Sequence, residues 1–247
     1  MARFFVSPDQ IRQDRIFIYD GDVNHIKNVL RMKIGEELSV SDGEGTDYHC
    51  SIESIDNDAV GLRIIDSWQS YTELPVRLYL FQGLPKSDKM ELIIQKAVEL
   101  GAYEIIPVST SRSIVKLDDK KAGKKISRWQ QISESGAKQS GRAIIPKISD
   151  VMSFKQALAY AKELDAILIP YEKAENMAET KAVIESLKNE QTKSIGIFIG
   201  PEGGFSNEEV ELAIEAGAKP ITLGKRILRT ETAGLTTLSI LMFEFEV

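Results

Sequence analysis

The stretch IGPEGGFS, from Ile199 to Ser206, follows the apolar run SIGIFIG and overlaps the start of the pattern SNEEVELAIEAG. A continuous apolar run of this length is typical of a strand that is buried on both faces of a sheet. Ser206 and Glu209 have the spacing of a capping box and Gly217 suits a helix end, so the second pattern predicts a helix. A buried strand that turns directly into a helix is the repeating unit of a parallel α/β sheet.

The same alternation of strand and helix extends from Pro75 to the carboxyl end of the sequence. Apolar strands are expected at residues 76–84, 104–109, 165–170, 194–200 and 220–224. Helices are expected at residues 87–101, 127–140, 182–189, 206–217 and 230–247. Ser87 is the expected N-cap of the first, and Leu92, Ile93, Val98 and Leu100 are expected on its apolar face. We therefore predict an α/β domain over residues 73–247, with helices on both faces of a parallel sheet.

Residues 1–72 predict a different kind of domain. Short alternating strands are expected at residues 15–20, 37–42, 47–55 and 60–66, joined by hairpin-type connectors. Residues 22–36 predict a helix, because Val23, Ile26, Val29 and Leu30 recur there at helical spacing. Short strands with one helix favour a small β-barrel, and the polar stretch at residues 67–75 marks the domain boundary.

The composition is that of an ordinary globular protein, with 43% hydrophobic and 28% charged residues among 247. No run approaches the ~18 apolar residues of a membrane helix, and the first residues do not resemble a secretion signal. Because one cysteine and two histidines offer neither an internal disulfide nor a Cys/His metal site, we expect a cytoplasmic protein without a metal.

The charge is unevenly distributed along the chain. The net charge is −6, yet the segment from Arg112 to Lys147 holds ten Lys/Arg against three Asp/Glu. A cationic cluster on an acidic protein favours a local contact with a polyanion such as RNA, and it disfavours indiscriminate coating of nucleic acid. The alternative is a solvated helical face with no partner.

Two glycine-marked turns follow neighbouring strands of the predicted sheet. In open parallel sheets, ligands bind outside the carboxyl ends of the strands, where both turns are expected. Neither turn matches the G-x-G-x-x-G dinucleotide pattern or the phosphate-binding P-loop. The turns either cradle a ligand of another kind or only connect strand to helix.

Several motifs together resemble the ribosomal RNA small-subunit methyltransferase E family, within the SPOUT methyltransferases. They are FIGPEGGFSNEE, LGKRILRTETA, PKSDKMELIIQKAVELG, RWQQISESGAKQSGR, RFFV and HIKNVLRMKIGE, which occur in the family's order over nearly the whole chain. The resemblance implies a SPOUT-type α/β parallel sheet with a carboxyl-terminal trefoil knot and an amino-terminal PUA-like β-barrel. It also implies a homodimer that uses S-adenosyl-L-methionine to methylate N3 of a uridine in the decoding region of 16S ribosomal RNA.

The same resemblance suggests where the chemistry lies. Arg229 is the candidate for substrate orientation and for stabilising charge on the uracil oxygens, since its planar fork suits such acceptors. Glu202 and Glu231 are candidate acceptors of the N3 proton. Alternatively, Arg229 forms a salt bridge with one of these glutamates, and each carboxylate only caps a helix or holds a turn.

The candidate binding residues fall into two groups. The cofactor group is Ile169, Pro170, Ile199, Gly200, Gly203, Gly204, Leu223, Gly224, Ile227, Leu228, Thr232 and Ala233. The RNA group is Arg3, Lys27, Arg31, Gln139, Ser140 and Arg142. Two rival functions remain: an RNA-binding or assembly protein without catalysis, and a SPOUT enzyme acting on transfer RNA or on a ribose 2′-hydroxyl.

Overall fold

The computed structural model of the chain describes residues 1–115, 119–174 and 176–246. The chain forms two compact units. The N-terminal unit comprises Met1–Glu73 and Ala137–Ile145, and the C-terminal unit comprises Leu74–Gly136 and Pro146–Val247. A single boundary after residue 72 did not anticipate that Ala137–Ile145 packs with the N-terminal unit. Of the basic segment, Lys116 and Asp118 lie outside the described residues.

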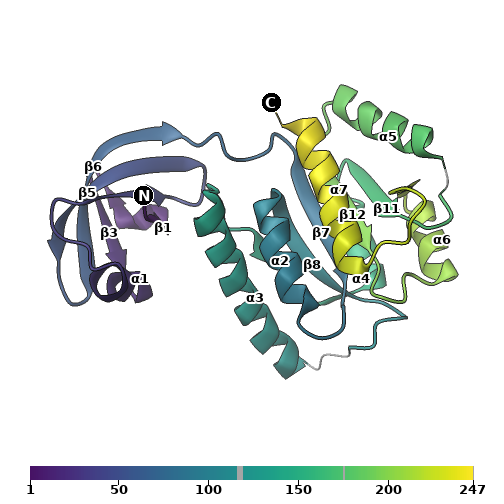
Figure 1. Cartoon of the computed structure of the whole chain (residues 1–247), viewed down its shortest axis with the longest axis horizontal. Coiled ribbons are helices and arrows are strands. Elements are labelled where there is room, and N and C mark those ends of the chain that lie inside the picture. The colour runs from purple at the N-terminus through teal and green to yellow at the C-terminus, as the bar shows by residue number, and fades with distance from the viewer. Residues whose placement is uncertain (116–118, 175, 247) are drawn as a thin grey trace. The chain divides into compact units, whose positions relative to one another are not determined.

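The C-terminal unit is built on a parallel sheet, as the alternation of strand and helix predicted (Figure 1). Its order is β10-β8-β7-β12-β11-β13, with β9 also paired to β8, and every pairing is parallel. The strands are β7 (Arg77–Gly83), β8 (Ala102–Ser109), β9 (Lys147–Ile148), β10 (Met152–Ser153), β11 (Ala166–Pro170), β12 (Ser194–Ile199) and β13 (Lys219–Ile221).

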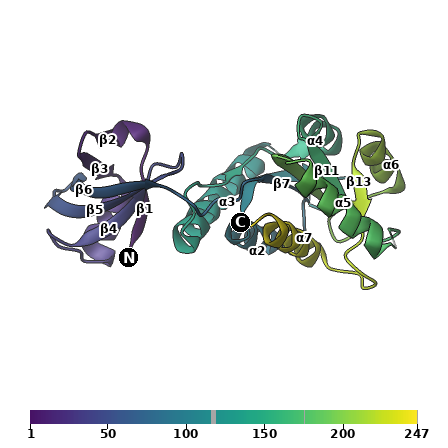
Figure 2. The ribbon, with the colours of Figure 1, turned by 90° about the horizontal axis from the view of Figure 1, so that it is seen from above.

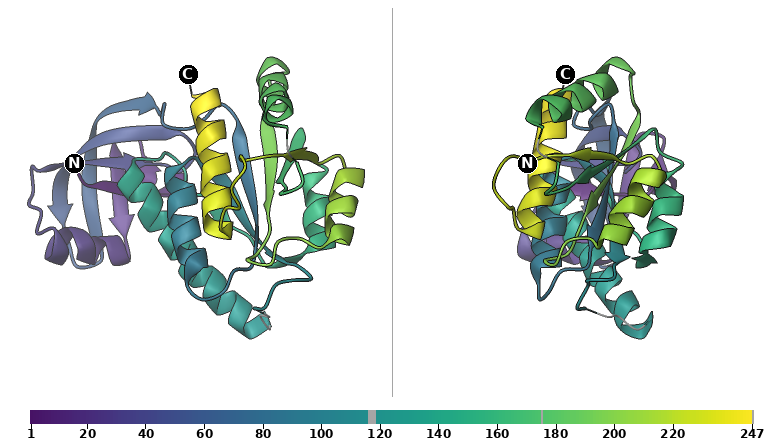
Figure 3. Two further views of the ribbon diagram at one scale, coloured as in Figure 1. Left: turned by 45° about the vertical axis from the view of Figure 1, so that its right-hand side comes forward. Right: turned by 90° about the vertical axis from the view of Figure 1, so that its right-hand side faces the viewer.

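Helices cover both faces of this sheet (Figure 3). On one face α4 and α6 pack over a core centred on Phe81 and Phe198, whose rings stack with centroids 4.5 Å apart. On the other face α2 and α7 pack against each other and against the sheet. The helices are α2 (Lys89–Glu99), α3 (Asp119–Ser140), α4 (Phe154–Ala161), α5 (Met177–Asn189), α6 (Asn207–Glu215) and α7 (Thr230–Phe245).

Two helix starts differ from expectation. The N-cap of α2 is Asp88 rather than Ser87, whose φ of 56° lies in the left-handed region. Helix α3 begins at Asp119 instead of near residue 127, because the lysine-rich segment before it consists largely of good helix formers. Leu92, which was expected on the buried face of α2, is 46% exposed, and Met90 and Ile94 are buried instead.

The N-terminal unit holds one sheet of order β1-β4-β5-β6-β3-β2 (Figure 2). Strand β1 runs parallel to β4, and the other pairs are antiparallel. Within the described residues, β1 does not pair with β2, so the sheet is a half-barrel rather than the closed barrel expected. The strands are β1 (Arg3–Phe5), β2 (Ile11–Arg12), β3 (Arg15–Tyr19), β4 (Glu37–Ser41), β5 (Thr46–Ile55) and β6 (Ala59–Gln69), with a 3-10 turn, η1 (Pro8–Gln10), before β2.

The helix expected over residues 22–36 is much shorter in the structure. It consists of α1 (Gly21–Asn24) and a single π-type turn, η2 (His25–Val29). Arg31 and Gly35 have φ values of 55° and 90°, which a right-handed helix does not accommodate. Consequently Val23 and Ile26 are buried in the core of the unit, whereas Val29 is 61% exposed. In neither unit is any described helix long and apolar enough to cross a membrane.

Candidate functional site

The turn that follows β12 lies directly against the end of β7. A Cβ atom on Gly83 would lie 2.7 Å from Pro201, and one on Gly200 would lie 2.9 Å from the backbone of Gly204. Real Cβ contacts are not this short, so both positions require glycine for close backbone packing. Gly204 has φ of +66°, and a Cβ there would meet no atom within 4 Å. The turn is thus tightly folded on one side and open on the other.

Side chains on both sides anchor this turn. The Phe205 ring packs against Phe154 of α4 with centroids 5.4 Å apart. Arg112 donates through Nη1 to the Gly203 carbonyl across 2.9 Å. Glu209 accepts from the Ser206 amide at 2.9 Å and the Ser206 hydroxyl accepts from the Glu209 amide at 3.2 Å, which confirms the capping box at the start of α6.

The first residue of α7 is joined to the same turn. The Thr230 hydroxyl donates to the Gly200 carbonyl across 2.6 Å and accepts from Gln82 Nε2 across 2.9 Å. Gln82 is completely buried at the end of β7 and donates its second amide hydrogen to the Gly83 carbonyl. Three separate segments, the ends of β7 and β12 and the start of α7, therefore meet at one hydrogen-bonded point.

A second junction is formed by charged side chains. Lys89, the first residue of α2, places Nζ 3.0 Å from Oε1 of Glu202 and 3.3 Å from Oε2 of Glu231. Glu202 follows β12 and Glu231 lies in the first turn of α7, so this ammonium joins the start of α2 to the turn after β12 and to the start of α7. No pattern in the sequence singled out Lys89 or Gln82, because their partners are remote in the chain.

The carboxylates of Glu202 and Glu231 differ in how many hydrogen bonds they accept. Both oxygens of Glu202 accept from the Lys86 amide, at 3.1 and 3.3 Å, in addition to the Lys89 ion pair. Burial favours the neutral acid, but hydrogen bonds from its own amide, the Lys89 ammonium and the Lys86 amide outweigh it and lower the pKa of Glu202. A carboxylate held in this way is suited to fixing a turn.

Glu231 is less constrained. Its Oε2 atom is buried and accepts no hydrogen bond from the described residues, although it faces the Lys89 ammonium. Its side chain remains 17% exposed. Of the two candidate proton acceptors, Glu231 is therefore the one with free acceptor capacity.

Arg229 is the N-cap residue of α7, and it is exposed. Within the described part of the chain it makes no ion pair, so the salt bridge to Glu202 or Glu231 does not form; both carboxylates face Lys89 instead. The guanidinium is consequently available at the same edge of the sheet as Glu231.

The structure places the candidate cofactor residues at three depths. Ile169 and Ile199 are buried, and Pro170, Gly204, Leu223, Gly224, Leu228 and Ala233 are half-buried. Gly203, Ile227 and Thr232 are exposed. Ile227 is 87% exposed, so its side chain does not line an apolar pocket in this structure. Gly224, at φ of +106°, leaves the turn after β13 open, because a Cβ there would meet no atom within 4 Å. The Tyr171 amide, just after β11, donates to the Ile221 carbonyl of β13 at 3.0 Å, so these two strand ends are also joined.

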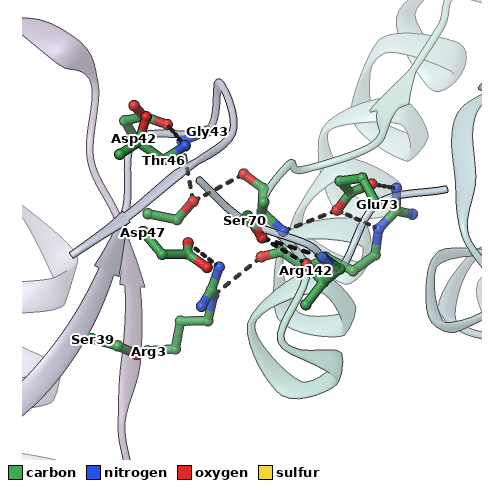
Figure 4. A network of polar contacts seen from close by, with 12 residues as sticks. Arg3, Ser39, Asp42, Gly43, Thr46, Asp47, Ser70, Glu73 and Arg142 are labelled. Carbon is green, nitrogen blue, oxygen red and sulfur yellow. Dashed lines mark hydrogen bonds and ion pairs between the residues drawn. The ribbon is translucent and has the colours of Figure 1, made fainter. Parts of the chain in front are cut away.

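Two of the candidate RNA residues have internal partners (Figure 4). Arg142 is 4% exposed, and its guanidinium forms an ion pair and hydrogen bonds with Glu73. Arg3 pairs with Asp47 at 2.5 Å and donates through Nε to the Arg142 carbonyl at 3.1 Å. Both arginines therefore help to hold Ala137–Ile145 in the N-terminal unit, and their guanidinium groups have internal partners.

The other candidate RNA residues are exposed. Lys27 donates to Asn57 at 3.1 Å, and Arg31, Gln139 and Ser140 lie on the surface of the N-terminal unit. In the C-terminal unit, Lys120, Lys121 and Lys124 are exposed on the first turns of α3. Arg128, farther along α3, is instead engaged by the Glu91 carboxylate at 2.6 and 2.8 Å.

An apolar groove of about 630 Å³ runs along the outer side of α7. Leu92 and Phe243, at 46% and 78% exposure, contribute to its lining. The remaining lining residues are Glu231, Thr232, Leu235, Thr236, Ser239, Ile240 and Glu244. Helix α7 thus presents apolar side chains both to the sheet and to the outside. No group of three or more His, Cys, Asp or Glu that could hold a metal occurs in the described ranges.

Each of the two units matches a known protein family. Residues 72–242 match the family model of an RNA methyltransferase domain, and residues 18–65 match that of an RNA methyltransferase PUA domain. Ribosomal RNA small subunit methyltransferase E of Bacillus subtilis (strain 168) is 40% identical over 252 aligned residues, covering 100% of this chain and 98% of that protein.

Solved structures agree with the sequence relatives. A ribosomal RNA small subunit methyltransferase E from Neisseria gonorrhoeae, bound to S-adenosyl methionine, is 30% identical with a TM-score of 0.85, over 98% of this chain and 97% of the other. A putative methyltransferase from Legionella pneumophila, in complex with its cofactor SAM, is 31% identical with a TM-score of 0.85 and the same coverage. The chain therefore belongs to the ribosomal RNA small subunit methyltransferase E family.

Proposed function

We propose that this protein transfers the methyl group of S-adenosylmethionine to N3 of a uridine in the decoding region of 16S ribosomal RNA. The observation that carries the proposal is the position of Arg229 and Glu231 at the start of α7, which the Thr230–Gly200 hydrogen bond joins to the glycine turn after β12. A cation for the uracil oxygens and a carboxylate with free acceptor capacity are the two groups that N3 methylation needs. Family membership supplies the reaction class.

The turns at this edge fit an adenosyl group. Ile169 and Ile199 are buried at the ends of β11 and β12, and the open Cβ positions at Gly204 and Gly224 leave the backbone of the following turns approachable. We assign cofactor binding to the turns after β11, β12 and β13. Within these turns the adenine ring is flanked by Pro170, Leu223 and Leu228. Thr232 and Ala233 lie nearby on α7. Ile227 contacts the cofactor only if its loop changes conformation.

When bound, S-adenosylmethionine supplies a methyl group made electrophilic by its sulfonium, so the remaining difficulty is the protonated N3 of uridine. Arg229 orients the base and stabilises the negative charge that develops on O2 and O4. Glu231 accepts the N3 proton, while Glu202 holds the turn. Positioning of this kind is worth about 7–11 kcal/mol in well-studied systems, and a fixed charge-stabilising donor about 3–4 kcal/mol.

We propose further that the carboxyl-terminal segment is threaded as a trefoil knot. The Thr230–Gly200 hydrogen bond supports this, because it ties the helix after β13 back to the turn after β12. Such threading is rare among proteins and rests here on the family.

We also propose that the protein is a homodimer that packs through the outer side of α7. A helix that is apolar all round is expected to be covered on both sides, and the groove with Phe243 and Leu92 provides the uncovered side. Analytical ultracentrifugation of a Phe243→Asp variant tests this, with a monomer as the expected result and an unchanged dimer as the contrary one.

For RNA, we propose contacts from the exposed lysines of α3 and from Lys27, Arg31, Gln139 and Ser140 of the N-terminal unit. A cytoplasmic location follows from this substrate. Transfer of labelled methyl groups to small ribosomal subunits and to stripped 16S RNA, both from cells lacking the enzyme, tests the function. Incorporation into either supports it, and no incorporation into either despite measurable cofactor binding would contradict it.

A further inference from the structure

Lys89 is placed between two carboxylates that come from different segments. Its Nζ lies 3.0 Å from Glu202 and 3.3 Å from Glu231, and only 29% of its side chain is exposed. The hydrogen bond that Lys89 donates to Glu202 has the largest effect on its pKa, and with the Glu231 contact it outweighs burial, so the pKa of Lys89 is raised and the ammonium stays charged. The cluster of one ammonium and two carboxylates has a net charge of −1 at neutral pH.

The two carboxylates use this ammonium differently. Glu202 already accepts from the Lys86 amide and is saturated. For Glu231, the ammonium is the only charged group that faces the buried Oε2 atom among the described residues. Next to this turn, the Gln82 amide nitrogen and the Gly200 carbonyl are occupied by Thr230, and Gln82 Oε1 accepts no hydrogen bond from the described residues. The ion pair between α5 and α7, Lys188 with Glu244, lies at the far end of α7.

We propose that Lys89 is a positioning residue for methyl transfer, which holds Glu231 by its Oε2 atom so that Oε1 is oriented to accept the uridine N3 proton. This inference rests on the proposed function. In the proton step the N3–H bond breaks, its electron pair stays on N3, and the proton passes to Glu231 and then to water. As that pair forms the bond to the methyl carbon, the methyl–sulfur bond of the bound donor would break with its electron pair on sulfur, which leaves S-adenosylhomocysteine. Lys89 itself touches neither the base nor the proton.

Three variants test the assignment. Lys89→Met removes the charge with little change in length, and Lys89→Arg keeps it. The matched control is Lys96→Met on the same helix, where the lost partner is Glu99, 2.7 Å away and three residues along. Each variant is assayed for S-adenosylmethionine binding by calorimetry, for thermal stability, and for kcat of RNA methylation between pH 5 and 9.

The proposal predicts that Lys89→Met lowers kcat at neutral pH by about tenfold or more. The KM for RNA, measured in the same assay, stays near the wild-type value, because Lys89 holds the proton acceptor and not the substrate. Lys89→Arg restores most of the rate, and Lys96→Met behaves as wild type. A purely structural role would lower stability or cofactor affinity together with kcat, without rescue by Lys89→Arg, and that result would overturn the proposal.

The outcome is separable from the fate of the proposed function. If the wild-type protein does not methylate uridine N3, the proposed function fails whatever Lys89 does. If the wild type is active and Lys89→Met retains its rate, only the role of Lys89 is overturned. Glu231→Gln provides a second check, because adding Lys89→Met to it should lower kcat no further if Lys89 acts through Glu231.

Discussion

The hydroxyl of Thr230 donates a hydrogen bond of 2.6 Å to the carbonyl oxygen of Gly200, so the start of α7 is tied to the start of the turn after β12. Thr230 is 5% exposed, and Gln82 donates to the same hydroxyl. Burial makes the loss of this group costly, because the Gly200 carbonyl and the Gln82 amide would both lose a partner. The shape of the glycine turn therefore depends on a residue that is distant in sequence.

Thr230→Val keeps the shape of the side chain and removes the hydroxyl. We expect it to lower the free energy of unfolding by about 1–3 kcal/mol and to weaken cofactor binding, since the turn loses its anchor. Urea unfolding and calorimetry measure the two effects. Thr236→Val, on the same helix and half-buried, is the control and should change neither. Unaltered stability and affinity in Thr230→Val would show that the hydrogen bond does not hold the turn.

Gly200→Ala tests the close packing within the turn. Its Cβ would lie 2.9 Å from the backbone of Gly204, so the turn must open, at a cost of about 1–3 kcal/mol in stability. We also expect loss of cofactor affinity. Gly123→Ala on α3 is the opposite case, because its Cβ would meet nothing within 4 Å, and it should stabilise the protein by about 0.5–1 kcal/mol. Equal effects of the two substitutions would contradict the structure of the turn.

Arg229→Ala separates substrate chemistry from cofactor binding. Because Arg229 is exposed and makes no ion pair within the described chain, its loss should leave stability and S-adenosylmethionine affinity unchanged. We expect kcat to fall by about 10²–10³, as when a charge-stabilising donor is removed. Arg229→Lys should recover only part of the rate, since it lacks the planar fork. Unchanged turnover in the alanine variant would remove Arg229 from the mechanism.

Arg142→Ala should act on stability more than on RNA binding. The substitution leaves Glu73 without its main partner in a nearly buried pair, which costs about 3–5 kcal/mol in comparable cases. Arg63→Ala breaks an exposed pair with Glu53 at 3.6 Å and should cost less than about 1 kcal/mol. If Arg142→Ala left unfolding unchanged but abolished RNA binding, the guanidinium would contact RNA after all.

The lysines of α3 should contribute to RNA binding through phosphate contacts. We expect Lys120→Ala with Lys124→Ala to lower affinity and to reduce the slope of log K against log salt by about two. Lys155→Ala with Lys181→Ala removes the same charge from exposed positions on α4 and α5, and should leave the slope unchanged. If both double variants lowered the slope equally, the α3 lysines would contribute only through the net charge of the protein and not through contacts of their own.

Lys27→Ala with Arg31→Ala examines the N-terminal unit by the same measurement. Both side chains are exposed. We therefore expect the slope of log K against log salt to be smaller in magnitude than for the wild type. An unaltered slope would exclude this surface from the RNA interface.

The order of strands and helices in the C-terminal unit was predictable because buried strands and amphipathic helices leave strong periodic patterns. Residues 22–36 show the limit: the apolar spacing was right at Val23 and Ile26, but positive φ values at Arg31 and Gly35 end the helix early. Leu92 was misplaced for a related reason, since periodicity cannot tell a core from an uncovered groove.

The site was predictable only as a set of turns. Glycines and polar residues at strand ends marked the segments after β12 and at the start of α7 that the structure brings together, whereas the pairing within them depended on long-range contacts. Lys89 joins Glu202 and Glu231, and Arg142 joins Glu73, through approaches that no local pattern encodes. From these contacts we propose Glu202 as a turn anchor rather than the base, and Arg142 as a structural residue rather than an RNA ligand.

The most direct test of the proposed function is the identity of the nucleoside that the protein makes. Small ribosomal subunits from cells lacking the enzyme are incubated with the purified protein and S-adenosylmethionine, and the 16S RNA is digested and analysed by mass spectrometry with fragment mapping. The account predicts one new N3-methyluridine, in the decoding region, that is absent with Arg229→Ala. A 2′-O-methylated nucleoside, or a methyl group on another RNA only, would contradict it.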